Sequence, residues 1–278
     1  MNKKSPSFKK DKHSANHNKH IRAGKGSTRT GKFQLEPLIA EGLSGVSEFV
    51  LHRPGLIKEI VVKNDLDSKA QGFLSRHWNG KIVQMEDWEV TSKEVPIPKT
   101  SLFATVTVPL RDEKWLSKEL VNMNEEDSSK SVPPVVLLDH VQDPRNFGAI
   151  IRSAAFFGVK YLVVPKARQA PVTNVVLSTA QGGLAHVNLV AVPNLVRVME
   201  KLKEHGFWAL GADMAGEPAA SLKGFYDRTV LVLGNEGSGL SALVRRKCDR
   251  IIGIPSGAVG VESLNVSVAA GILLYSLV

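Results

Sequence analysis

The second half of this 278-residue chain alternates short apolar runs with segments of helical periodicity, and this alternation restricts the fold more than any other feature. From residue 135 the apolar runs read VVLLD, KYLVVP, VNLVAVP, FWALGAD, TVLVLG and RIIGIP. Helical patterns follow four of them, namely NFGAIIRSAAFFG, NLVRVMEKLKEHG, SGLSALVRRKC and a last one from about Ser263, whereas the residues between KYLVVP and VNLVAVP read as a loop. Apolar strands that alternate with helices are typical of a parallel sheet covered on both faces. The sequence therefore predicts an α/β domain with a parallel sheet over residues 134–278.

The first half has a different organisation. Residues 33–110 predict a small α/β domain with a helix ending in VSEFVLHRP, strands at 57–63, 80–85 and 101–110, and a helix from Asp65, as N-cap, to His77. Residues 111–133 are polar and end in two prolines, so we expect a linker with one helical turn.

Charge is distributed unevenly along the chain. The formal net charge is +9, and the first 33 residues, with ten Lys or Arg and one acidic residue, carry all of it. Residues 1–32 are rich in Lys, His, Ser, Asn and Gly, which predicts a disordered basic tail. Two roles stay open for it: an electrostatic arm for RNA, or a tail that only aids solubility.

Several classes of protein are disfavoured. The apolar stretch from Leu264 to the end is short and contains Asn265 and Ser267, which favours a buried helix over a membrane span. A single cysteine, Cys248, excludes an internal disulfide and a Cys-rich zinc site, and no His or carboxylate set has the spacing of metal ligands, so no metal is expected. No apolar core follows the early lysines, so we expect no secretory signal and a cytoplasmic protein.

Three segments rich in glycine and polar residues follow predicted strand ends: LDHVQDPRNFGAIIRSAAFFG, LGNEGSGL and IPSGAVGVESLNVSVAAG. In a parallel sheet all three gather at one edge. The second segment lacks the Lys-Ser/Thr ending of a P-loop. The first has DHVQDPRNFG after the first strand, where a dinucleotide-binding domain has G-x-G-x-x-G. Glycines bring main-chain groups close to a ligand, and such groups can bind an adenine edge as well as an oxyanion.

The motifs NFGAIIRSA, LVLGNEGSGL and IPSGAVGVESLNVSVAAGILL resemble, in order and spacing, those of the SpoU/TrmH family of RNA 2′-O-ribose methyltransferases, a branch of the SPOUT class. The resemblance covers residues 135–278, and residues 33–110 more loosely resemble the substrate-binding domain of its rRNA guanosine branch. It implies a deep C-terminal trefoil knot, S-adenosylmethionine as methyl donor, and a homodimer whose active site uses both subunits.

The resemblance also implies roles for individual residues. It assigns the catalytic site to Arg152, Asn146, Glu236, Ser263 and Asn265. A guanidinium is a poor base, since its pKa lies above about 12, so holding the phosphate and orienting the hydroxyl is the conservative role for Arg152. Local alternatives stay open: a surface arginine, helix N-caps at Asn146 and Ser263, and a helix-dipole partner at Glu236.

We assign donor binding to Gly234, Ile254 and Leu264, and with less support to Gly211 and Asp213 at the end of FWALGAD. Cys248 is expected to be buried and inert, and His140, His186 and His205 to be structural. The predicted function is S-adenosylmethionine-dependent methylation of a ribose 2′-hydroxyl in RNA, most simply rRNA. The alternatives are a tRNA 2′-O-methyltransferase and a non-catalytic RNA-binding or ribosome-assembly factor.

Overall fold

The computed structural model describes residues 38–91, 98–125, 132–222, 227–257 and 263–278. The predicted basic tail lies outside these residues. All described residues belong to one unit, residues 32–278, and they form two separate sheets. The division into two domains stays a prediction.

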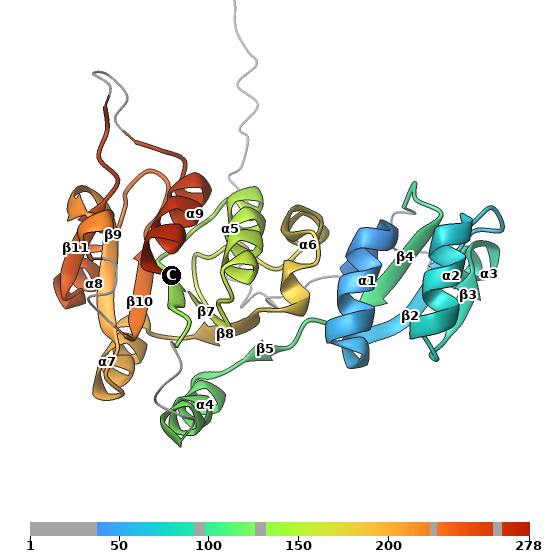
Figure 1. The fold of residues 1–278 in the computed structure, drawn as a ribbon, viewed down its shortest axis with the longest axis horizontal. Helices are drawn as coiled ribbons and strands as arrows, with labels where there is room; N and C mark the ends of the chain where they lie inside the picture. The colour runs from blue at the N-terminus through green and yellow to red at the C-terminus, as the bar shows by residue number, and fades with distance from the viewer. Residues whose placement is uncertain (1–37, 92–97, 126–131, 223–226, 258–262) are drawn as a thin grey trace, which may run out of the picture. The chain divides into compact units, whose positions relative to one another are not determined.

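The larger sheet has seven strands in the order β11-β9-β10-β6-β7-β8-β5, and every neighbouring pair is parallel (Figure 1). Its strands are β5 (Leu110–Arg111), β6 (Val135–Leu138), β7 (Tyr161–Pro165), β8 (Asn188–Val192), β9 (Trp208–Pro218), β10 (Thr229–Leu233) and β11 (Arg250–Gly253). From β6 the chain adds β7 and β8 on one side, whereas β9 and β10 lie on the other. The strand order therefore reverses between β6 and β10. The predicted parallel α/β sheet is confirmed.

Side chains alternate between the two faces of this sheet, as the period of a strand requires. One face packs Val136, Leu138, Leu162 and Leu231 against α5 (Pro144–Phe156), α6 (Asn174–Ala180) and α9 (Val266–Leu277). The other packs Val135, Leu137, Val163 and Val230 against α4 (Glu113–Glu125), α7 (Leu195–Glu204) and α8 (Ala242–Lys247). Helices on both faces leave the ends of the strands as the place for a site.

The segment predicted as a linker is mostly helical. α4 has thirteen residues, and its Leu116 and Leu120 are fully buried. The prediction of a linker with a single helical turn was wrong here. The leucines lie four positions apart on one face of a polar sequence, and contact with the sheet stabilises a helix that composition alone does not favour.

The smaller sheet has the strand order β1-β4-β2-β3. Its elements are β1 (Leu38–Glu41), α1 (Gly42–His52), the 3₁₀ turn η1 (Pro54–Leu56), β2 (Ile57–Val62), α2 (Ser68–His77), β3 (Ile82–Gln84), α3 (Met85–Thr91) and β4 (Leu102–Val106). Asp67, not Asp65, caps α2, because its side chain accepts the amide hydrogen of Ala70 at 2.8 Å. The predicted mixture of helices and strands is confirmed.

Other differences lie near strand ends. The predicted loop after β7 contains α6 and the 3₁₀ turn η2 (Gly183–Ala185), and a further 3₁₀ turn, η3 (Ala219–Leu222), follows β9. β9 extends beyond Asp213, because its second half pairs with β11 after a shift of register. The last helix begins at Val266, with Asn265 rather than Ser263 as its N-cap. No helix in the described part of the chain is long and apolar enough to span a membrane.

Candidate active site

The structure brings two of the three motif loops together at the carboxyl ends of β6 and β10. The amide of Asp139 donates to the carbonyl of Leu233 at 2.7 Å and continues the β6–β10 pairing by one step. α5 is the next element after β6 and is capped by Asp143, whose side chain accepts the amide hydrogen of Arg145 at 2.7 Å. Asn146 is therefore not the N-cap of α5, and its side chain is available for other contacts.

A chain of side-chain hydrogen bonds connects all three motifs. Asn146 donates through Nδ2 to Glu236 Oε1 at 3.0 Å and accepts at Oδ1 from Asn265 Nδ2 at 2.9 Å. Asn265 also caps α9, since its Oδ1 accepts the amide hydrogen of Ser267 at 2.8 Å. We call these three residues the amide chain. It fixes α5, the loop after β10 and the start of α9 relative to one another.

The loop after β10 is a tight turn held by its own side chain. Asn235 and Gly239 exchange two main-chain hydrogen bonds of 3.0 Å, and Asn235 Oδ1 accepts from the amides of Gly237 and Ser238. A Cβ atom at Gly234 would lie 2.2 Å from the carbonyl carbon of Gly239, so only glycine fits there. The turn therefore presents Asn235 and Glu236 in fixed directions.

Arg152 lies on α5, six residues after Asn146, and is exposed. Within the described residues its side chain makes no hydrogen bond or ion pair. Its main chain is close-packed, because a Cβ atom at Gly183 would lie 3.3 Å from Arg152 Cα. The structure thus joins Asn146, Glu236 and Asn265 directly, and it leaves Arg152 as an exposed cation on the helix that supplies Asn146.

Of the predicted donor-binding positions, Gly234 follows β10, Ile254 follows β11 and Leu264 lies just before α9, whereas Gly211 and Asp213 lie within β9. Ile254 is half-buried against the core, whereas Leu264 is 45% exposed, and Ser263 beside it is also exposed. Asp213 is already engaged, because it pairs with Arg245 and accepts the amide hydrogen of Ala215 at 2.9 Å.

The main chain of β9 is crowded at Gly211. A Cβ atom at Gly211 would lie 2.7 Å from Cys248 Sγ. Burial raises the pKa of the Cys248 thiol to about 11, which fits the expectation of an inert cysteine, although the side chain is only half-buried.

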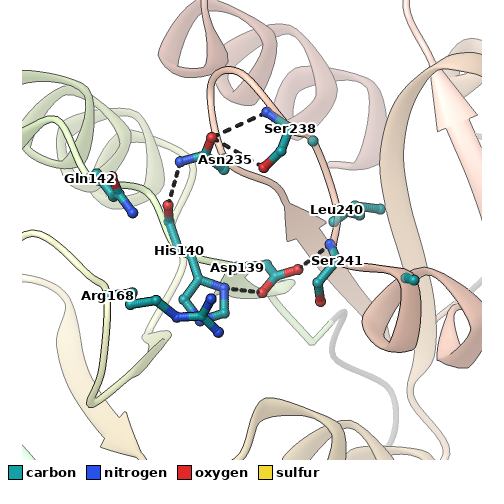
Figure 2. A pocket seen from close by; sticks show the side chains of 10 residues that line it. Asp139, His140, Gln142, Arg168, Asn235, Ser238, Leu240 and Ser241 are labelled. Atoms are coloured by element: carbon teal, nitrogen blue, oxygen red, sulfur yellow. Dashed lines mark hydrogen bonds and ion pairs between the residues drawn. The ribbon is translucent and has the colours of Figure 1, made fainter.

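A cavity of about 400 Å³ opens beside the turn after β10, Asn235–Gly239, which we call the β10 turn (Figure 2). Its lining residues are Asp139, His140, Gln142, Arg168, Asn235, Ser238, Gly239, Leu240, Ser241 and Ala242. His140 and Arg168 both have left-handed backbone, with φ of 66° and 55°. The sequence predicted a structural role for His140 and did not indicate Arg168 or Gln142. Neither a left-handed backbone angle nor the path of the loop after β7 produces a periodic pattern in the sequence, so these positions could not be recognised there.

One further cluster escaped sequence reasoning. Glu48, His52 and His186 place one ligand atom each within 4.8 Å of one another, with Glu48 Oε2 lying 2.7 Å from His186 Nε2. Glu48 and His52 are four residues apart on α1, but His186 is 138 residues from Glu48, so no local spacing indicates the group.

Comparison with known proteins identifies relatives that match more than half of the chain. The chain is 42% identical over 166 residues to the 23S rRNA (guanosine-2′-O-)-methyltransferase RlmB of Xanthomonas campestris, which covers 59% of this chain and 65% of the relative. It is 41% identical over 160 residues to an uncharacterized tRNA/rRNA methyltransferase of Synechocystis, which covers 57% of this chain and 41% of the relative. These matches span less than two thirds of the length of either relative.

A solved structure extends the likeness to most of the chain. The SpoU methyltransferase AviRb of Streptomyces viridochromogenes, solved in complex with AdoMet, superposes with a TM-score of 0.67 at 26% identity and covers 86% of this chain and 88% of its own. The model of the SpoU rRNA Methylase family matches residues 133–275, just over half of the sequence, and includes the amide chain and Arg152. The predicted resemblance is confirmed, and the chain belongs to the SpoU rRNA Methylase family.

Proposed function

We propose that the protein transfers a methyl group from S-adenosylmethionine to a ribose 2′-hydroxyl of RNA, with rRNA as the substrate. The observation that carries the proposal is the amide chain, in which Asn146, Glu236 and Asn265 from three separate motifs are hydrogen-bonded to one another. Membership of the family and the names of its relatives support the reaction. We also propose that the protein acts in the cytoplasm, because rRNA is the proposed substrate.

The residues at the strand ends fit a nucleoside-type donor. Ile254 and Leu264 offer apolar surface to an adenine ring, and the glycine-rich main chain near Gly234 offers N–H and C=O groups to its edge. Of the other two candidates, Gly211 has little room beside Cys248, and Asp213 is occupied by Arg245, so we rank both below the first three. When bound, S-adenosylmethionine supplies an electrophilic methyl group on a sulfonium.

The chain's own residues supply position and charge. Arg152, an exposed cation, is suited to hold the phosphate beside the target ribose and to orient its hydroxyl. Glu236 accepts from both Asn146 and Asn235, so it fixes the loop against α5. In this displacement the bound donor would supply its methyl group to the 2′-hydroxyl oxygen and leave as S-adenosylhomocysteine, and the hydroxyl proton would pass to solvent. Orientation of the hydroxyl can provide much of the rate of such a displacement.

We also propose the homodimer and the trefoil knot that the family resemblance implies. Support for a dimer comes from large apolar side chains on the outer surface of α5 and α9, where Phe156 is 83% exposed and Tyr275 67%. These two helices lie side by side (Figure 1). Support for a knot comes from the return of the chain from β11, at the edge of the sheet, to α9, which packs on α5 and η3.

The test is methyl transfer from labelled S-adenosylmethionine to unmodified 23S rRNA transcribed in vitro, with unmodified tRNA as a second substrate. We expect label in a dinucleotide that resists alkaline hydrolysis, because 2′-O-methylation removes the hydroxyl that alkali needs. Arg152→Ala should lower kcat by about 100-fold or more while donor binding by calorimetry stays within twofold. Arg197→Ala, which removes an exposed arginine that pairs with Glu113 on the opposite face, is the matched control and should keep full activity.

The outcomes separate the alternatives. Label only in tRNA would make tRNA the substrate in place of rRNA. This alternative has support, because one relative is named as a tRNA/rRNA methyltransferase. RNA binding without transfer or donor binding would indicate a non-catalytic RNA-binding protein and would overturn the proposal.

A further inference from the structure

The cavity beside the β10 turn lies where parallel α/β sheets usually bind ligands. β6 and β10 are neighbours in the sheet, and the strand order reverses between them. Ligands bind beyond the carboxyl ends of the strands at such a reversal, because the connections there leave the sheet on opposite faces. The cavity is lined by the loops that follow these two strands and by Arg168 from the loop after β7.

Hydrogen bonds between the three loops fix the walls of the cavity. Asn235 Nδ2 donates to the carbonyl of His140 at 2.9 Å, and the amide of Ser241 donates to Asp139 Oδ2 at 2.7 Å. The amide of Ala170 donates to the carbonyl of Val141 at 3.0 Å and ties down the loop that carries Arg168. The cavity is therefore built before any ligand enters.

The lining groups divide into those that build the wall and those that remain available. Asp139 is 1% exposed, and its Oδ1 lies 2.7 Å from His140 Nδ1 (Figure 2). This contact leaves Nε2 of the imidazole available to a ligand. Within the described residues the side chains of Gln142 and Arg168 make no hydrogen bond or ion pair. A cation, an imidazole nitrogen and an amide thus converge without partners in the described chain.

The backbone at these residues is also unusual. His140, Arg168 and Gln181 are the described non-glycine residues with left-handed backbone, and two of the three line this cavity. Left-handed backbone is unfavourable for residues with a Cβ atom, and such positions concentrate at binding sites. Glycine would avoid this cost at both positions.

We propose that this cavity binds an RNA nucleotide adjacent to the methylated one, with Arg168 on its phosphate and Gln142 and His140 on the edge of its base. The inference rests on the proposed function and deepens it. A volume of about 400 Å³ suits one nucleotide, and an amide beside an imidazole offers both donors and acceptors to a base. Asn235 connects the two sites, because its Nδ2 donates both to the carbonyl of His140 and to Glu236 Oε2.

The decisive variant is Arg168→Gly in the full chain, because it removes the guanidinium and relieves the left-handed backbone together. The matched control is Lys166→Ala, which removes a cation from the same loop that does not line the cavity. Affinity for unmodified in vitro transcribed 23S rRNA is measured by filter binding with S-adenosylhomocysteine present. Donor affinity is measured by calorimetry and the melting temperature by calorimetric scanning.

We expect Arg168→Gly to weaken RNA binding by about tenfold and to raise KM for RNA with little change in kcat. Its melting temperature should equal or exceed that of the wild type, and its donor affinity should be unchanged. Lys166→Ala should weaken RNA binding by less than twofold. Gln142→Ala, which alters an exposed side chain, should weaken RNA binding about threefold and provides a second test that does not depend on loop conformation.

Wild-type RNA affinity in both Arg168→Gly and Gln142→Ala would overturn the inference, whether or not methylation persists. Equal losses in Arg168→Gly and Lys166→Ala would also overturn it, because they would indicate a diffuse charge effect. Failure of the proposed function is distinct: the wild-type protein itself would then neither bind the donor nor transfer label.

Discussion

The amide chain and the cavity, which share the β10 turn, use their polar side chains in opposite ways. In the amide chain, Asn146, Glu236 and Asn265 take one another as partners, so their geometry is complete without a ligand. In the cavity, hydrogen bonds to main chain build the wall, whereas Arg168 and Gln142 have no partner in the described chain. The difference indicates a preorganised network on one side and a recognition surface on the other, since an unpartnered polar group gains most when a ligand arrives.

The amide chain and the cavity also differ in the backbone conformation of their residues. The amide chain is carried by the first turn of α5, the β10 turn and the N-cap of α9, none of which places these residues in the left-handed region. The cavity depends on His140 and Arg168, both in that region. The amide chain therefore uses two helix ends and a turn with ordinary backbone at these residues, while the cavity uses conformations that the surrounding structure has to stabilise.

The largest expected effect comes from Gly234→Ala, which should damage both sides at once. The added Cβ atom would lie 2.2 Å from Gly239 C and 2.4 Å from Leu240 N, so the β10 turn must shift. We expect a loss of about 1–3 kcal/mol in the free energy of unfolding, measured by denaturant titration, and weaker binding of both donor and RNA. Gly257→Ala, where nothing lies within 4 Å, controls for the substitution and should leave unfolding nearly unchanged. If Gly234→Ala weakened only donor binding or only RNA binding, the two functions would not depend on the same turn.

A smaller effect separates capping from positioning in the amide chain. Asn265→Ala removes the cap of α9 and the bond to Asn146, so it should cost about 1 kcal/mol of stability and about tenfold to 100-fold in kcat. Asn265→Asp keeps the oxygen that accepts from Ser267 but loses the Nδ2 donor to Asn146. It should therefore keep the stability and show the same fall in kcat, with RNA affinity unchanged. Full activity in Asn265→Asp would show that the bond between Asn265 and Asn146 has no catalytic role.

The smallest effect concerns Cys248, which lies against Gly211 on the donor side. Burial raises the pKa of its thiol to about 11, above the ordinary value, so the reactive thiolate is scarce at neutral pH. Alkylation by iodoacetamide should therefore be slow at pH 7 and rise about tenfold per pH unit toward pH 11 while the fold persists, as followed by mass spectrometry. A rate that levels off near pH 8.5 would indicate an ordinary, accessible thiol and a looser packing of β9 than the structure describes.

Much of the fold was predictable because its signals are local. The apolar runs of β6, β7, β8, β10 and β11 are continuous, and their alternation with helical patterns predicts parallel strands. The contributions of Asn146, Glu236 and Asn265 to one site followed from motif order together with the rule that parallel strands end at one edge. Their assignment as catalytic residues, with Arg152 and Ser263, stays a prediction.

The errors arose where a polar segment gains its structure from contact. α4 looked like a linker because its buried residues, Leu116 and Leu120, are few, and only the sheet beneath them makes the helix favourable. The N-caps at Asp67 and Asn265 each lie two residues after the predicted position, because several capping residues occur together and the surrounding packing selects one.

The sequence by itself determined the parallel sheet, its two apolar faces and the membership of three motifs in one site, because side-chain periodicity and strand direction are properties of neighbouring residues. Only the tertiary structure decided that Asn146 bonds to Asn265, 119 residues away, and that His140 and Arg168 converge on a cavity. The physical reason is that hydrogen bonds between distant loops, and the left-handed backbone that they stabilise, depend on the packing of the whole sheet and leave no pattern in the local sequence.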